Sequence, residues 1–208
     1  KLEQLKENIS SINVNLSKNY YVYLIYLILF HYLFHYFIFE RSALSSDDFA
    51  NFIKYKNFIN LNFLDFFEKF NDRPISYFVI NLIHHNFIGN PIYYLFLLFF
   101  SSSLMIILVF LFFNLITKNI QHSFILTILY DLLPNKLEIF HSSIFININL
   151  VICLYLFTLV FYFLFYNNKN YFFLLFSYFF YLISVFWYEV GFFIPFFFVN
   201  ICEFSNCI

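Results

Sequence analysis

The chain has 208 residues, of which 62% are hydrophobic, 27% aromatic and only 11% charged, and its formal net charge is −1. This composition lies far outside the usual range of soluble domains and indicates an integral membrane protein. Because the net charge is near zero and no basic run exists, the chain lacks the electrostatic footprint of nucleic-acid binding, and no nucleic-acid partner is expected. The only glycines are Gly89 and Gly191, which excludes a Gly-rich phosphate loop for a nucleotide.

The first part of the chain predicts a membrane helix followed by a large loop. A polar N-terminal segment, residues 1–19, leads into the apolar run 20–39, which is long enough to cross a hydrocarbon core of about 30 Å as a helix. Residues 40–73 hold most of the charges and are therefore expected outside the hydrocarbon. Aromatic and aliphatic residues recur there at helical intervals among lysines and acids, which predicts helices lying flat in the interface.

Further apolar segments predict an all-α polytopic protein with about six membrane helices, one or two of them short, in a single membrane domain covering residues 1–208. The apolar segment 75–87 is short and is followed by Gly89-Asn90-Pro91, where Gly can stop one helix and Pro can start the next. We therefore interpret this segment as interfacial or re-entrant. Polar breaks at 117–122 and 167–170 separate later helices. The expected segments after the loop are 75–87 (short), 92–116, 124–133 (short), 144–166, 171–187 and 192–202.

Alternating crossings place the loop 40–73, the turn 134–141 and the pair Tyr188-Glu189 on one side of the membrane. Lysines in the short turns, Lys118 and Lys169, favour the opposite side as cytoplasmic, which makes the loop extracytoplasmic or lumenal. The expected location is the bacterial inner membrane or the ER membrane, with the mitochondrial inner membrane as the alternative. Nine of the twelve acidic residues fall on the loop side or close to it: Glu40, Asp47, Asp48, Asp65, Glu68, Asp72, Asp131, Glu138 and Glu189.

Short motifs follow one another in a recognisable order. They are Phe39-Glu40-Arg41 through Asp47-Asp48-Phe49, Asn71-Asp72-Arg73-Pro74, Gly89-Asn90-Pro91, Leu133-Pro134 with Glu138, and Tyr188-Glu189 ahead of Pro195. This order resembles the N-terminal membrane half of the GT-C glycosyltransferases, particularly the protein O-mannosyltransferase-like branch, over about residues 20–202. The resemblance implies a GT-C-like fold and an inverting enzyme that transfers sugar from a polyprenyl-phosphate donor to an acceptor on the extracytoplasmic or lumenal face. Tyr188 stands where the family commonly has Lys, so a reduced relative or a fragment fits the same pattern.

The chemistry of such a transfer selects candidate residues. A carboxylate must take the acceptor proton and a cationic group must hold the departing phosphate. Asp47 and Asp48 are the candidate catalytic pair, although Asp or Ser at this position would also cap the helix expected to follow. Arg73 is the candidate for the donor phosphate, through its bidentate fork, or else an interfacial Arg bound to a lipid headgroup or to Asp72.

Glu138, His141 and Glu189 are the candidates for positioning substrate where helices meet the outward face. The two glutamates would need no function if they were only solvated helix-end carboxylates. Glu138 and His141 supply only two ligands for a metal, and the three cysteines have no ligand spacing, so no metal site is assigned. A divalent cation is the only cofactor left open.

His31 and His35 are four residues apart in the first apolar helix and are expected to face the protein interior and hydrogen-bond to neighbouring helices. His84 and His85 are adjacent, so on a helix they point in different directions and a shared metal is not expected.

The expected partners are membrane lipid, the polyprenyl-phosphate sugar donor and other membrane subunits. The rival interpretation is a non-catalytic hydrophobic subunit of a large complex, for instance an organelle-encoded respiratory one, because aromatic-rich, Gly-poor chains serve as helical packing material. A transporter is a third class, but the sequence shows neither paired inverted repeats nor a run of pore-lining charges.

Overall fold

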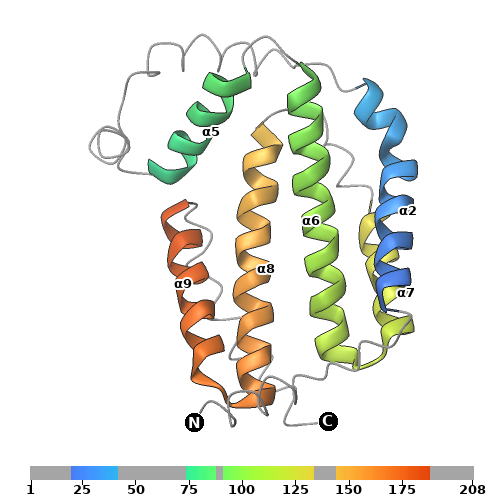
Figure 1. Ribbon diagram of the computed structural model, residues 1–208, viewed down its shortest axis with the longest axis vertical. Helices are drawn as coiled ribbons and strands as arrows, with labels where there is room; N and C mark the ends of the chain where they lie inside the picture. Colours follow the sequence, from blue (N-terminus) through green and yellow to red (C-terminus); the bar gives the residue numbers. More distant parts are fainter. Residues whose placement is uncertain (1–19, 42–73, 88–90, 134–143, 188–208) are drawn as a thin grey trace.

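The computed structural model describes residues 20–41, 74–87, 91–133 and 144–187, and its regular structure within these ranges is entirely helical (Figure 1). The expected all-α class is therefore confirmed for the part of the chain that is described. The helices are α2 (Tyr20–Arg41), α5 (Pro74–Phe87), α6 (Pro91–Thr117), α7 (Ile120–Asp131), α8 (Ile144–Asn168) and α9 (Tyr171–Trp187).

Most helix boundaries follow from residues that the sequence makes visible. Both α5 and α6 begin at a proline, whose fixed φ and missing N–H suit the first helical turn. With 27 residues, α6 is about 40 Å long at 1.5 Å per residue, whereas the 14 residues of α5 reach only about 21 Å. The short helix α5 is thus too short to cross a bilayer core of about 30 Å unaided.

Among the residues that the structure describes, two helical segments are long and apolar enough to cross a membrane, Phe96–Thr117 and Ile146–Asn168, and two further apolar segments, Tyr20–His35 and Tyr171–Trp187, are shorter. Large apolar side chains face outward on α2 and α9, while serines, asparagines, histidines and an aspartate are buried between helices. This distribution is typical of a membrane protein, since lipid tolerates apolar surface and the polar groups find partners inside. The count of six spans and the GT-C-like arrangement stay predictions.

The helix α6 lies at the centre of the arrangement, with α8 packed on one side and α2 and α7 on the other, and α9 packs mainly on α8 (Figure 1). One apolar cluster joins α2, α6 and α7 through buried side chains that include Leu27, Ile106 and Phe110. A second joins α6 to α8 through Met105, Leu108 and Cys153. Stacked aromatic rings pack α9 against α8. The ring centroids of Phe157 and Phe161 lie 5.0 and 5.6 Å from that of Phe180.

The start of α7 differs from the prediction. Gln121 and His122 were expected in a polar break before a helix starting at residue 124, but the helix already begins at Ile120. The reason is Asn119, whose side-chain oxygen accepts hydrogen bonds from the backbone N–H groups of Gln121 (2.9 Å) and His122 (3.2 Å). An N-cap of this kind satisfies two of the amides that a helix start leaves without partners, so the polar side chains sit exposed on the first turn.

Two tight turns in the described part of the chain, at Lys118-Asn119 and Lys169-Asn170, use the same Lys-Asn pair. Lys118 and Lys169 both have left-handed φ angles, 51° and 53°, and their N–H groups close the preceding helices on Asn114 and Phe165. The asparagine that follows each lysine then caps the next helix; the side-chain oxygen of Asn170 accepts from the N–H of Phe172 at 3.0 Å. A left-handed residue followed by a capping asparagine thus reverses the chain in two or three residues.

Candidate functional site

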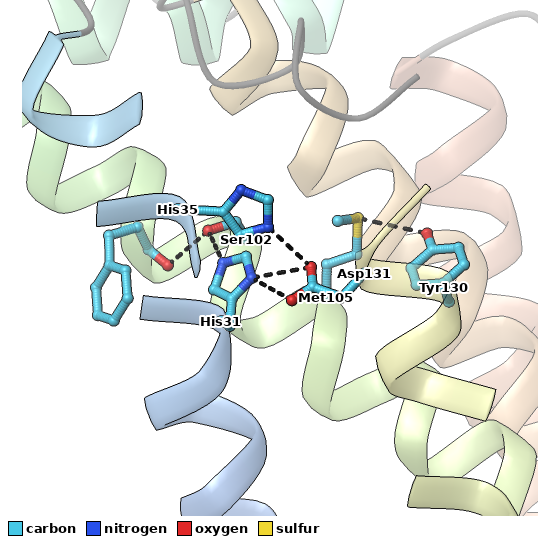
Figure 2. A network of polar contacts seen from close by, with 7 residues as sticks. His31, His35, Ser102, Met105, Tyr130 and Asp131 are labelled. Atoms are coloured by element: carbon cyan, nitrogen blue, oxygen red, sulfur yellow. Dashed lines mark hydrogen bonds and ion pairs between the residues drawn. The ribbon is translucent and has the colours of Figure 1, made fainter. Parts of the chain in front are cut away.

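A cluster of buried polar side chains lies between α2, α6 and α7 (Figure 2). His31 Nδ1 lies 3.0 and 3.1 Å from the two carboxylate oxygens of Asp131, and His35 Nε2 lies 3.2 Å from one of them. On its other side, the ring of His31 places Nε2 2.9 Å from the hydroxyl of Ser102. We call His31, His35, Ser102 and Asp131 the His-Asp cluster.

Three helices position the members of the His-Asp cluster. The two histidines are four residues apart on α2 and therefore share one face of that helix. Asp131 is the last residue of α7, which packs against both α2 and α6. Ser102 is the middle one of three consecutive buried serines of α6, and its small side chain leaves room for the His31 ring. The sequence expectation that His31 and His35 face inward and bond to neighbouring helices is confirmed.

Burial makes the charges of the His-Asp cluster energetically important. The exposed fractions are 0% for both histidines and 2% for Asp131, so water does not screen this carboxylate. The negative end of the α7 dipole also falls at Asp131, and no basic residue occupies the last turn of α7. A carboxylate in this place needs a positive charge beside it, because an uncompensated buried charge is very costly.

The hydrogen bonds of Ser102 and His31 indicate where that positive charge can lie. The Ser102 hydroxyl has one hydrogen and reaches the carbonyl oxygen of Phe99 at 3.0 Å. When Ser102 donates there, its oxygen must accept the Nε2–H of His31, and a neutral His31 would then turn a bare Nδ1 lone pair toward the carboxylate. Either a proton on Nδ1 or a metal cation between Nδ1 and the carboxylate removes this repulsion.

A second polar chain joins the ends of three other helices. The Trp187 indole N–H donates to the side-chain oxygen of Asn147 at 2.6 Å, and the Asn147 amide donates to the Ser76 hydroxyl at 2.8 Å. Trp187 ends α9, Asn147 lies in the first turn of α8 and Ser76 lies in the first turn of α5. These bonds hold the three helix ends to one another.

The residues predicted for catalysis and binding lie outside the described ranges. Asp47, Asp48 and Arg73 belong to 42–73, Glu138 and His141 to 134–143, and Glu189 to 188–208. What the structure does describe are helix ends that flank these segments. Three of these ends, the C-terminal ends of α2 and α9 and the N-terminal end of α8, lie toward the upper end of the molecule in Figure 1, where α5 also lies.

The sequence analysis missed Asp131 as a partner of the histidines and counted it only among the acids near one side of the membrane. Its partners lie 96 and 100 residues away, so local spacing could not reveal them. The available signal was a lone carboxylate at the end of an apolar segment, because an ionisable residue at membrane depth is expected to pair with another polar group of the protein.

Comparison of the chain with protein-family models, with curated proteins and with solved structures found no match.

Proposed function

We propose that the chain is a membrane glycosyltransferase, or a reduced relative or fragment of one, that takes sugar from a polyprenyl-phosphate donor. The observation that carries the proposal is the hydrogen-bonded chain of Ser76, Asn147 and Trp187, which holds the starts of α5 and α8 to the end of α9. Arg73 precedes Ser76 by three residues and Glu189 follows Trp187 by two. The helix ends nearest to these candidates in the sequence, those of α5, α8 and α9, are therefore held together.

The length of the connecting backbone limits the distance between these candidates and the hydrogen-bonded residues Ser76 and Trp187. A chain spans at most about 3.6 Å per residue, so the Cα atom of Arg73 stays within about 11 Å of that of Ser76, and Glu189 within about 7 Å of Trp187. Asp48 and Glu138 are tethered less tightly, through the end of α2 and the start of α8. A lipid-linked donor suits this arrangement, because a site at one end of an apolar bundle is open to the membrane interface.

In the proposed reaction Asp48 or Asp47 takes the proton of the acceptor hydroxyl as its oxygen attacks the anomeric carbon of the sugar. The bond from that carbon to the phosphate oxygen breaks at the same time, which inverts the anomeric centre and leaves the polyprenyl phosphate. Arg73 holds the phosphate through charge-assisted hydrogen bonds as its negative charge develops. Glu138, His141 and Glu189 orient the donor and acceptor hydroxyls.

Mass spectrometry of lipids that copurify with the protein tests the proposal. The comparison includes the native chain, Arg73→Ala and Asp48→Asn, with Lys118→Asn as the control that removes a cation from the opposite end of α6 and keeps a residue tolerant of the left-handed φ. We expect a polyprenyl phosphate or its sugar conjugate in all samples except Arg73→Ala. Bulk phospholipid alone in every sample would contradict the proposal and favour the non-catalytic subunit.

A further inference from the structure

The His-Asp cluster has no part in the proposed sugar transfer, and it combines features of a metal centre. Two imidazoles and one carboxylate offer one ligand atom each, and these atoms all lie within 4.8 Å of one another. Imidazole and carboxylate together suit divalent transition metals, zinc above all, better than the oxygen-only ligand sets that calcium and magnesium prefer. We infer that His31, His35 and Asp131 form a binding site for a zinc-like divalent cation.

The distances in the His-Asp cluster fit this assignment. A tetrahedral zinc with bonds of about 2.0–2.1 Å has ligand atoms about 3.3 Å apart. The contacts of Asp131 with His31 Nδ1, at 3.0 Å, and with His35 Nε2, at 3.2 Å, are close to that edge length. A cation can therefore take the place of the protons between Asp131 and the two imidazoles. His31 and His35, one helical turn apart on a rigid helix, are already aligned for such a cation.

The contact with Ser102 supports Nδ1 as the ligating nitrogen of His31. Ligating histidines usually donate their second ring N–H to a neighbouring acceptor, which fixes the tautomer and the ring orientation. The Ser102 oxygen lies 2.9 Å from His31 Nε2 and its hydrogen is directed to the Phe99 carbonyl, so Nδ1 is left as the ligating atom of His31. Ser102 thus acts as a positioning residue and not as a ligand.

The local charges also favour a cation. Two neutral imidazoles and one carboxylate around a doubly charged ion leave one net positive charge, and the negative end of the α7 dipole offsets part of it. Three protein ligands are the number found in zinc sites that take a fourth ligand from solvent or substrate. Such a centre would tie the C-terminal end of α7 to α2, in addition to the apolar cluster that joins these two helices to α6.

The experiment measures metal binding by the 208-residue chain in detergent, with Zn²⁺ and Co²⁺ as probes. The background carries Cys202→Ser and Cys207→Ser, which removes two of the three thiols and so limits thiolate binding. We expect one zinc per chain by elemental analysis after dialysis, and visible Co²⁺ absorption bands of a tetrahedral nitrogen and oxygen site. His31→Ala, His35→Ala and Asp131→Asn should each lose both signals.

Two further variants separate a metal centre from a purely hydrogen-bonded cluster. His122→Ala removes an exposed histidine from the first turn of α7 and should keep full stoichiometry. Ser102→Ala should keep the Co²⁺ bands but weaken zinc affinity roughly tenfold or more, as loss of a group that orients a ligand does. Absence of tetrahedral Co²⁺ bands in the native chain, or an equal loss of zinc in His122→Ala, would overturn the inference even if the ligand variants failed to fold.

Discussion

Replacing Asp131 by alanine should destabilise the protein by about 3 kcal/mol when no metal is present. The substitution removes three contacts of 3.0, 3.1 and 3.2 Å to the two buried histidines. Breaking a buried charged pair costs about 3–5 kcal/mol, and we take the lower end because both histidines can remain neutral once the carboxylate is gone. The assay is reversible unfolding in mixed micelles containing a chelator, followed by helical circular dichroism.

A double-mutant cycle isolates the interaction that the structure assigns to this pair. We expect His31→Ala and Asp131→Ala together to cost about 1–3 kcal/mol less than the sum of the single variants, as for residues in direct contact. The matched control is Leu132→Ala, at an exposed neighbour of Asp131, which should change stability by less than about 0.5 kcal/mol. A loss below about 1 kcal/mol for Asp131→Ala, or additive single effects, would refute the reasoning.

Substitutions at three other positions test the helix ends. Asn147→Leu should cost about 1–2 kcal/mol, because it leaves the indole N–H of Trp187 without its acceptor, and it should shift the emission of Trp187, the only tryptophan of the chain; unchanged emission would contradict the described bond. Asn119→Ala should cost about 1 kcal/mol in the same unfolding assay by removing the cap of α7, whereas Asn119→Asp should be tolerated. Lys118→Gly should stabilise by about 1 kcal/mol, since glycine adopts a φ of 51° without steric strain, and a destabilised variant would argue against that turn.

Apolar run length and the few polar breaks were enough to predict most helices of the described chain. The segments 75–87, 144–166 and 171–187 agree with α5, α8 and α9 to within two residues at either end. This works because a backbone without water must satisfy its own hydrogen bonds, so long apolar runs fold as helices. The predicted start of α7 was wrong because the polar side chains of Gln121 and His122 were interpreted as a break between helices, whereas they lie in the first turn of a capped helix.

The His-Asp cluster was only half visible in the sequence. The spacing of His31 and His35 predicted a shared inward face, since helical periodicity is a local property. The choice of Asp131 as their partner depends on how α7 packs against α2, which is a tertiary property that no local pattern contains. The same limit applies to the bond between Trp187 and Asn147, which joins two helices over 40 residues.

The most direct test of the account asks whether the predicted site residues share one side of the membrane. Single cysteines replace each residue in a cysteine-free background and are labelled with a membrane-impermeant maleimide in sealed vesicles of known orientation. The positions are Asp48→Cys, Arg73→Cys, Glu138→Cys and Glu189→Cys, with Lys118→Cys and Lys169→Cys as markers of the opposite side. We predict that the first four cysteines are labelled from one side of the membrane and the two marker cysteines from the other. Labelling of any of the four from the same side as Lys118→Cys and Lys169→Cys would contradict the account.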